Sequence, residues 1–217
     1  MSDVVVSDRR FPEPKTVEFL GLTQTHYISD LSEVVYTPVI QGKAIPTHQH
    51  LAAQIGMCAG GSYLMKCADS EETILPFGNA CNVQPNILHG APYPAAEAYL
   101  SLDIKRAAPE RACYQEPGGF RSAGAEQQFG GLRARVVTAP WFRILYGTLA
   151  AGSALDLGGE RPEVIGIPFG GRTQVRIDGS ERECGERNVF FAPAGAALEV
   201  NNPNAEDARL VLALITV

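Results

Sequence analysis

Two short stretches of the chain carry side chains that together could hold a metal ion. The first contains His48, His50 and Gln54, and the second ends in His89. His48 and His50 are two residues apart, so their side chains point to the same face if both lie on a strand. Imidazole nitrogens suit first-row divalent metals, and an amide oxygen can complete such a ligand set. The four side chains are predicted to surround one divalent transition metal per chain: Fe, Co, Ni, Mn or Zn.

Glycines flank these ligand-type residues at regular distances. Gly42 and Gly61 enclose the first stretch, and Gly78 precedes the second. In the alternative interpretation, His48 and His50 are edge-strand histidines that face water. A His-x-His pair alone is common, but the joint spacing of four ligand-type residues and these glycines favours the metal site.

The spacing of the histidines and glycines resembles the two sequence motifs of the cupin superfamily. Gln54 stands where most cupins have glutamate, and Gln84 and Asn86 stand where proline and glycine are usual. An amide in place of a carboxylate leaves the full double charge on a bound divalent ion. Such an ion is a stronger Lewis acid for an anionic ligand such as a 2-oxo acid.

Composition and charge argue against several classes of protein. A chain of 217 residues can form one large or two small domains, and a net charge of −6 argues against a nucleic-acid partner. There is no run of 18 apolar residues, and residues 1–10 do not resemble a secretion signal. The five cysteines form no C-x-x-C pair, which indicates free thiols in a reducing compartment. We therefore expect a cytoplasmic protein that does not span a membrane.

Short β-forming runs alternate with glycine, proline and asparagine along the chain, which predicts an all-β barrel or sandwich. Strands are expected at residues 34–39, 54–57, 62–67, 81–84, 99–104, 142–149, 164–168, 173–177, 189–192 and 210–216. A shift of 110 residues places Gly42 on Gly152, Gly56 on Gly166, and Gly61 on Gly171. This duplication predicts a bicupin, with two jelly-roll β-barrels in one chain.

Three segments follow from the duplication. Residues 1–106 are predicted to form the N-terminal cupin barrel with the metal site, 107–132 a linker with one short helix, and 133–217 a C-terminal degenerate cupin barrel. In the second barrel, Gly158, Glu160 and Val164 take the places of His48, His50 and Gln54. Later in the chain Pro193-Ala194-Gly195 stands in the place of Gln84-Pro85-Asn86, a shift of 109 residues, so Leu198 takes the place of His89. This barrel is therefore predicted to lack a metal and to be structural or to shape a partner surface. Because such barrels commonly pair through exposed strands, we also expect a homodimer.

Strand alternation nominates three residues for proton transfer. On the strand after Gly61, Tyr63, Met65 and Cys67 are expected to point into the barrel, and Tyr99, Ser101 and Asp103 share one face of a later strand. If these faces line the cavity, Tyr63, Tyr99 or Asp103 could shuttle a proton. In the alternative interpretation, the tyrosines fill the barrel, and Asp103 caps a turn or pairs with Arg106.

Four strings of residues resemble a narrower family, the bicupin isomerases of bacilysin biosynthesis, whose relatives serve the Choi moiety of aeruginosins. The strings are Phe11-Pro12 with Pro14-Lys15, His48-Gln49-His50 with Gln54-Ile55-Gly56-Met57, His89-Gly90-Ala91, and Asp103-Ile104-Lys105-Arg106. The resemblance covers the first ~105 residues well and the remainder weakly. It implies a metal-dependent isomerase that moves ring double bonds in a dihydro-4-hydroxyphenylpyruvate, a small 2-oxo acid, in antibiotic biosynthesis. The bacilysin enzyme carries metal ligands in both barrels, whereas this sequence keeps them only in the first.

Other functions fit the same ligand pattern. An Fe(II)-dependent cupin dioxygenase could use the same side chains, and consumption of oxygen would distinguish it from an isomerase. A non-catalytic ligand-binding cupin would bind a small molecule without converting it. A storage or scaffold role is the remaining alternative.

Overall fold

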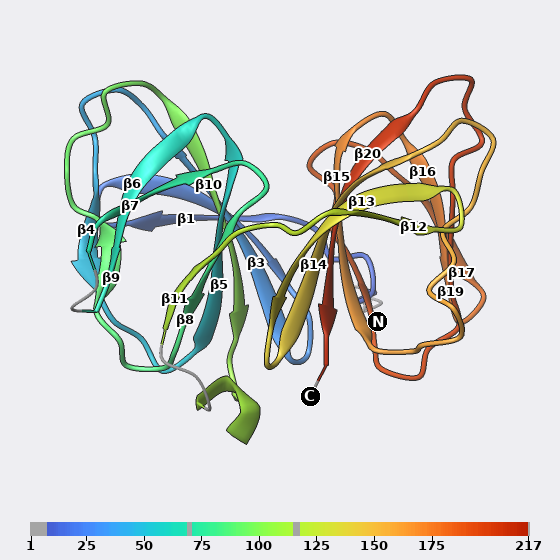
Figure 1. Cartoon of the computed structure of the whole chain (residues 1–217), viewed down its shortest axis with the longest axis horizontal. Helices are drawn as coiled ribbons and strands as arrows, with labels where there is room; N and C mark the ends of the chain where they lie inside the picture. The colour runs from blue at the N-terminus through green and yellow to red at the C-terminus, as the bar shows by residue number, and fades with distance from the viewer. Residues whose placement is uncertain (1–7, 69–70, 115–117, 217) are drawn as a thin grey trace, which may run out of the picture. The chain divides into compact units, whose positions relative to one another are not determined.

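The computed structural model describes residues 8–68, 71–114 and 118–216 (Figure 1). These residues form antiparallel β-strands and one short 3-10 helix, η1 (Arg111–Tyr114), which confirms the predicted all-β class. No helix in this part of the chain is long and apolar enough to cross a membrane. The prediction about a secretion signal falls largely on residues 1–7, outside the described residues.

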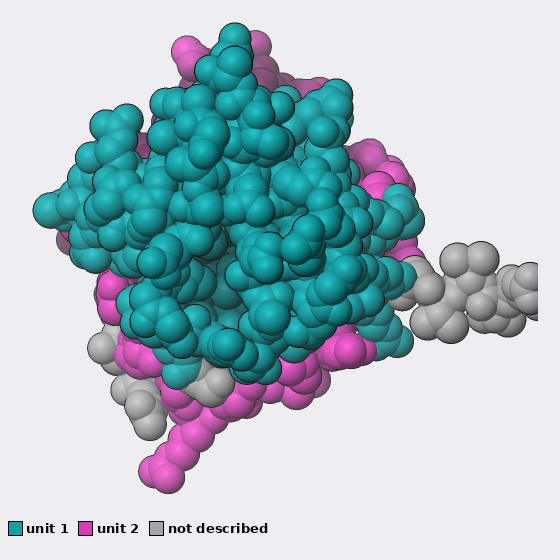
Figure 2. Space-filling model, turned by 90° about the vertical axis from the view of Figure 1, so that its right-hand side faces the viewer, with its two compact units in different colours: residues 1–13, 125–136, 142–216 teal, residues 14–124, 137–141, 217 magenta. Residues whose placement is uncertain are grey.

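The chain divides into two compact units, which are coloured separately in Figure 2. The first barrel comprises residues 14–124 and 137–141, and the second barrel comprises residues 8–13, 125–136 and 142–216. The prediction assigned residues 8–13 to the first barrel and residues 107–132 to a linker, whereas here residues 107–124 belong to the first barrel and residues 125–132 to the second. Residues 8–13 group with the second barrel because Phe11 is buried in its core.

The first barrel contains two sheets whose strand pairs are antiparallel. Seven strands form one sheet in the spatial order β1 (Lys15–Phe19), β2 (Leu22–Ile28), β3 (Ser32–Val39), β10 (Tyr99–Arg106), β5 (Ala53–Gly60), β8 (Ala80–Val83) and β11 (Gly119–Arg121). Four strands form the other in the order β4 (Ile45–His48), β9 (His89–Ala91), β6 (Ser62–Cys67) and β7 (Thr73–Pro76). The smaller sheet supplies two of the predicted metal ligands.

The second barrel repeats this arrangement with fewer strands. Six strands form one sheet in the order β12 (Glu126–Phe129), β13 (Leu132–Ala139), β14 (Phe142–Leu149), β20 (Ala208–Ile215), β15 (Glu163–Gly170) and β18 (Phe190–Ala192). Three strands form the other in the order β17 (Ser180–Cys184), β16 (Thr173–Ile177) and β19 (Leu198–Asn201). The segment predicted as a linker thus carries η1, β11 and β12.

The duplication seen in the sequence is present strand by strand. The bounds of β14 and β15 follow those of β3 and β5 by 110 residues at both ends. Gly61 and Gly171 connect equivalent strands with φ of 76° and 74°, a left-handed conformation that favours glycine. A Cβ at Gly61 would lie 3.2 Å from the Ala98 carbonyl oxygen, so the turn is also tightly packed. The predicted bicupin architecture is confirmed.

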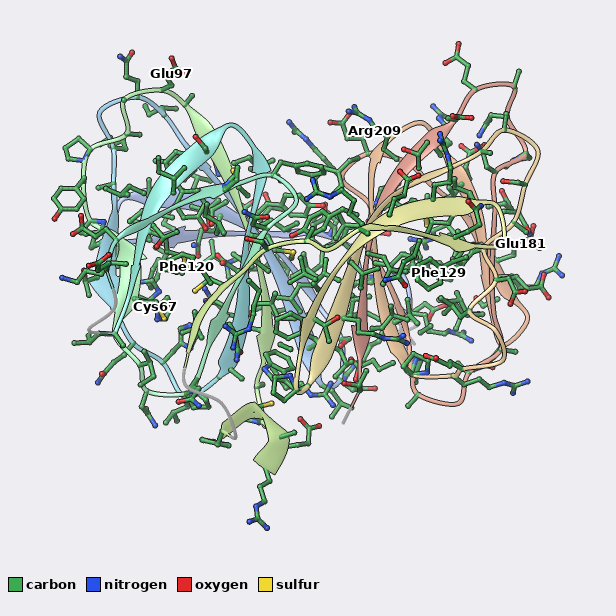
Figure 3. All side chains as sticks on the ribbon, viewed as in Figure 1. Cys67, Glu97, Phe120, Phe129, Glu181 and Arg209 are labelled. Atoms are coloured by element: carbon green, nitrogen blue, oxygen red, sulfur yellow. The ribbon has the colours of Figure 1, made fainter. Side chains whose placement is uncertain are left out.

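Each barrel has its own apolar core, because alternate side chains of its strands point inward. On β6, Tyr63, Met65 and Cys67 are buried, as the alternation predicted. Phe120 packs against the core of the first barrel and Phe129 against that of the second (Figure 3). All five cysteines are buried and free, as predicted.

Candidate metal centre

Neighbouring strands bring two of the predicted ligands together. β4 ends at His48 and β9 begins at His89, and these two residues are direct cross-strand partners. Gln54 is the second residue of β5, in the larger sheet. His50 lies two residues beyond the end of β4, so the expectation that it shares a strand with His48 is wrong. Its position depends instead on the conformation of the connection to β5.

The three histidines form a compact cluster, and their candidate ligand atoms all lie within 4.8 Å of one another. The ring centroids of His48 and His89 are 4.5 Å apart, and those of His50 and His89 are 4.8 Å apart. This is the one group of three or more potential ligands among His, Cys, Asp and Glu in the described residues. The geometry suits a single divalent ion.

Backbone carbonyls fix the tautomer of all three imidazoles. Nδ1 of His48 lies 2.9 Å from the Pro46 oxygen, and Nδ1 of His50 lies 2.9 Å from the Ala52 oxygen. Nδ1 of His89 lies 2.8 Å from the Ile87 oxygen. A carbonyl only accepts hydrogen bonds, so each Nδ1 carries the proton and each Nε2 keeps its lone pair. Such orientation by outer hydrogen bonds is typical of metal-binding histidines.

Burial keeps the three imidazoles neutral. It lowers the pKa of His48 and His50 and lowers the pKa of His89 to about 3. The Nε2 atom of His89 is buried and has no hydrogen-bond partner in the described structure. An unpartnered buried nitrogen is costly, and a cation among the three rings would satisfy it. The residues therefore fit a divalent ion.

Gln54 completes the set through a contact with Asp103. Its Nε2 donates a hydrogen bond of 3.0 Å to Oδ1 of Asp103, so its Oε1 faces the cluster and lies 2.9 Å from Nε2 of His50. Oε1 of Gln54 and Nε2 of His50 then present lone pairs to each other, and a cation bound by both atoms would stabilise this arrangement. Asp103 thus orients Gln54. The alternative in which Asp103 pairs with Arg106 is wrong, because the Arg106 guanidinium donates to Glu110 instead.

A cavity of about 20 Å³ adjoins the cluster, and His48, Gln54, His89, Tyr63, Ser101 and Asp103 are among its lining residues. A volume of that order admits one water-sized group. Asp103 therefore lies beside the candidate ligands, and burial raises its carboxyl pKa to about 6. Ser101, whose Oγ lies 3.5 Å from Oδ2 of Asp103, was expected on the same strand face as Asp103 but was not among the predicted site residues.

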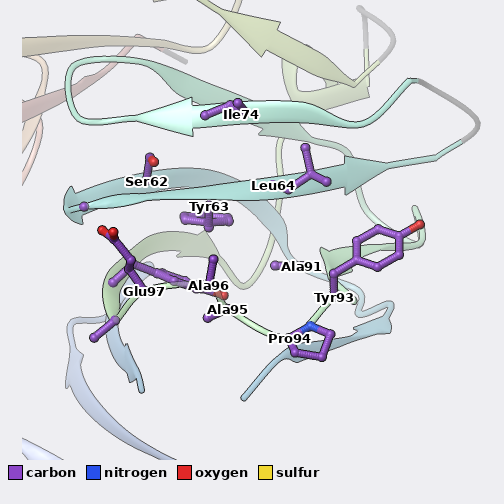
Figure 4. A pocket seen from close by; sticks show the side chains of 13 residues that line it. Ser62, Tyr63, Leu64, Ile74, Ala91, Tyr93, Pro94, Ala95, Ala96 and Glu97 are labelled. Carbon is purple, nitrogen blue, oxygen red and sulfur yellow. The ribbon is translucent and has the colours of Figure 1, made fainter. Parts of the chain in front are cut away.

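The two predicted tyrosines lie side by side, and one of them reaches this cavity. Their rings stack with centroids 4.6 Å apart. The Tyr63 hydroxyl donates to the Met57 carbonyl at 3.3 Å, whereas the buried Tyr99 hydroxyl has no hydrogen-bond partner among the described residues. Both line a larger groove of about 500 Å³ (Figure 4), and only Tyr63 also lines the small cavity.

Close packing of β4 against β9 depends on a residue whose role the sequence did not reveal. A Cβ at Gly90 would lie 2.9 Å from the carbonyl oxygens of both Ile45 and Pro46. Pro46 is also the hydrogen-bond acceptor of His48. Gly90 therefore allows the approach that brings His48 and His89 together. In the sequence Gly90 stood out only as part of the string His89-Gly90-Ala91, and its packing role was not predicted.

His26, the fourth histidine of the chain, and the residues at the ligand positions of the second barrel lie outside the cluster. His26 is bonded to Glu33 at 2.6 Å through Nδ1 and to Gln24 at 3.1 Å through Nε2. In the second barrel, the carboxylate of Glu160 pairs with Arg143, and Val164 is buried in the apolar core.

The fold and the histidine cluster together define a bicupin fold in which the described residues hold one candidate metal centre, in the first barrel. No family model matches the chain. The sequence is similar to the H2HPP isomerase of Bacillus subtilis, with 26% identity over 184 residues, which are 83% of this chain and 78% of that protein.

Solved structures show the same fold. The crystal structure of AerE from Microcystis aeruginosa has a TM-score of 0.84 at 20% identity, over 97% of this chain and 100% of AerE. A variant of the Bacillus subtilis oxalate decarboxylase has a TM-score of 0.76 at 12% identity, over 97% of this chain and 78% of that one. Both likenesses confirm the predicted architecture.

Proposed function

We propose that the chain is a metal-dependent isomerase that shifts ring double bonds of a dihydro-4-hydroxyphenylpyruvate-like 2-oxo acid in bacilysin- or aeruginosin-type biosynthesis. The observation that carries the proposal is a half-buried carboxylate, Asp103, on the wall of the same cavity as the histidine cluster. The similarity to a protein named H2HPP isomerase supports the reaction and the substrate class.

His48, His50 and His89, with Gln54, would hold the ion. When bound, a divalent ion supplies a Lewis acid that polarises the keto group of a 2-oxo acid and acidifies the neighbouring C–H bond. Fe, Co, Ni, Mn and Zn all suit this ligand set. The oxalate decarboxylase with the same fold is described by its Mn(II) centres, but the ligands here do not select one metal.

The chain's own acid–base groups would move the proton. Asp103 takes it from the substrate, because a carboxyl pKa near 6 suits a general base at neutral pH. Tyr63 is our candidate for returning a proton further along the conjugated system, and Tyr99 holds the ring of Tyr63 by stacking. No net oxidation occurs, since one proton leaves the substrate and one returns.

The substrate ring needs more room than the small cavity provides. The groove in Figure 4 offers about 500 Å³ and is lined by Leu64, Ile74 and Tyr93 among others. Tyr63 and Ala91 line both spaces. We propose that the substrate ring occupies the groove, with Tyr63 held in place at the boundary that the two spaces share.

Oxygen-free turnover tests the proposed function. The decarboxylation product of prephenate is supplied anaerobically, and near-ultraviolet absorbance and deuterium uptake from D2O are followed. We expect rising absorbance from a conjugated product, deuterium in that product, and loss of both signals with a chelator. Conversion only in the presence of oxygen would establish the dioxygenase alternative instead. No conversion of any substrate in this class would refute the isomerase while leaving the fold unaffected.

The ligand positions of the two barrels predict one ion per chain. His50→Ala should remove the ion, whereas Glu160→Ala, the change at the equivalent position of the second barrel, should leave the metal content at one and the rate within about twofold, as is usual for exposed sites. Elemental analysis after gel filtration measures both. Two firmly bound ions per chain would contradict this prediction.

Gln54→Glu should keep the ion but slow the reaction by about tenfold. The added negative charge reduces the polarisation of the keto group, and a glutamate carboxylate has no N–H to donate to Asp103. Steady-state kinetics with metal analysis would separate the two effects. An unchanged rate with glutamate at this position would show that the neutral amide has no catalytic importance.

A further inference from the structure

Lys105 is a half-buried cation on β10, the strand that carries Asp103. Side chains two residues apart on a strand point to the same face of the sheet. Lys105 therefore shares a face with Ser101 and Asp103, which line the small cavity. It is also the direct cross-strand partner of Gln54 on β5. The Cβ atoms of such partners lie about 5 Å apart, so the lysine side chain begins beside a candidate metal ligand.

The Lys105 ammonium forms no ion pair or hydrogen bond with the described residues. Its partner on the other neighbouring strand is Glu33, whose carboxylate bonds Nδ1 of His26 at 2.6 Å instead. The next residue, Arg106, points to the opposite face and bonds Glu110. A half-buried charge loses hydration, and this loss is unfavourable when no partner replaces the lost water. Lys105 is thus a cation that is available to a ligand.

The charge of Lys105 reaches the candidate metal centre. Burial is the main cause of the low pKa of the three clustered histidines, and the positive charge of Lys105 lowers each pKa further. Burial raises the pKa of the Asp103 carboxyl, and Lys105 partly offsets that rise. The ammonium therefore lies within electrostatic range of both the candidate ligands and the proposed base.

With a divalent ion bound, this site would carry an excess of positive charge. The imidazoles and the Gln54 amide are neutral, and the Asp103 carboxylate would offset only part of the charge of the ion. Lys105 adds a further positive charge nearby, which is unfavourable unless an anion binds as well. The carboxylate of a 2-oxo acid supplies such an anion.

We propose that Lys105 binds the carboxylate of the 2-oxo acid and so sets the direction in which the substrate lies. On the same face of β10, Tyr99 stands on one side of Asp103 and Lys105 on the other. With its carboxylate at Lys105, the substrate extends past Asp103 toward Tyr63 and the groove in Figure 4. This assignment rests on the proposed function for the class of substrate, and it makes Lys105 a substrate-binding residue.

Binding of phenylpyruvate tests the role of Lys105, because this 2-oxo acid has an aromatic ring that cannot undergo the isomerisation. The zinc-loaded full chain is titrated by calorimetry with phenylpyruvate and with its methyl ester, which lacks the negative charge. Lys105→Gln should weaken binding of the acid about 10- to 100-fold, the range for one hydrogen bond between charged groups. Binding of the ester should stay within about twofold of the wild type.

Three further variants complete the test. Lys105→Arg keeps the charge and should restore most of the affinity for the acid. Lys66→Gln is the matched control, because Lys66 is an exposed lysine on β6 of the same barrel, and its affinity should equal that of the wild type. Lys105→Met provides a second neutral side chain of similar length if the glutamine variant does not fold. Elemental analysis verifies that every variant holds the same amount of zinc.

The results separate the role of Lys105 from the isomerase activity. No binding of phenylpyruvate to the wild type, equal affinity for the acid in wild type and Lys105→Gln, or an equal loss for acid and ester would each overturn the role of Lys105. A protein that isomerises its substrate but shows one of these results would refute only this role. Binding that depends on Lys105 in a protein without turnover would refute only the isomerase.

Discussion

Replacing His89 with alanine should abolish both metal binding and turnover. His89 is 2% exposed, its Nδ1 is anchored to Ile87, and its Nε2 has no described protein partner. Loss of a directly bound imidazole should cost more than the 10- to 100-fold loss of metal affinity typical of outer-sphere changes, so at least about 100-fold is expected. The metal content should fall from one ion per chain to nearly zero, and the rate should fall to background.

The control for this experiment is His26→Ala. His26 belongs to the same barrel but is bonded to Glu33 and Gln24 and not to the cluster. Its replacement should leave the metal content unchanged, as measured by elemental analysis after dialysis. Circular dichroism would verify that both variants fold. A folded His89→Ala protein with a full complement of metal would show that the ion, if present, lies elsewhere.

Asp103→Asn should lower the rate by about 10²- to 10⁴-fold, the usual contribution of a general base, and leave the metal content near one. Asparagine has nearly the same shape and keeps an oxygen that can accept the hydrogen bond from Gln54, but it cannot take a proton from the substrate. Stopped-flow absorbance and exchange of the substrate proton with D2O measure this step.

Ser101→Ala is the matched control for Asp103→Asn, since Ser101 lines the same cavity and bonds Asp103 weakly at 3.5 Å. It should reduce the rate by less than about tenfold, because only a neutral hydrogen bond is lost. If Asp103→Asn instead released the metal, the residue would act by positioning Gln54 and not by accepting a proton.

Much of the first barrel follows from local patterns in the sequence. Period-two alternation predicted the buried face of Tyr63, Met65 and Cys67. Glycines at equivalent turns revealed the duplication, because a left-handed turn conformation restricts the residue type locally. The identity of the candidate ligands followed from spacing in the same way.

Other features depend on residues far apart in the sequence. Ten strands were not among the expected runs: β1, β2, β4, β7, β9, β11, β12, β13, β17 and β19. Most of them are short or exposed, and such strands need partners from elsewhere in the chain to form. The link between Gln54 and Asp103 spans 49 positions, and no local pattern could favour it over the alternative with Arg106.

The sequence by itself determined the all-β class, the duplication, and which side chains could bind a metal, because these depend on residue type and short-range periodicity. Only the tertiary structure decided that carbonyls of Pro46, Ala52 and Ile87 turn the three imidazoles toward one point. It also decided that a cavity remains where the second barrel has lost its ligands. The orientation of a buried ring and the volume of a cavity arise from packing between strands distant in the chain, and local sequence does not specify such packing.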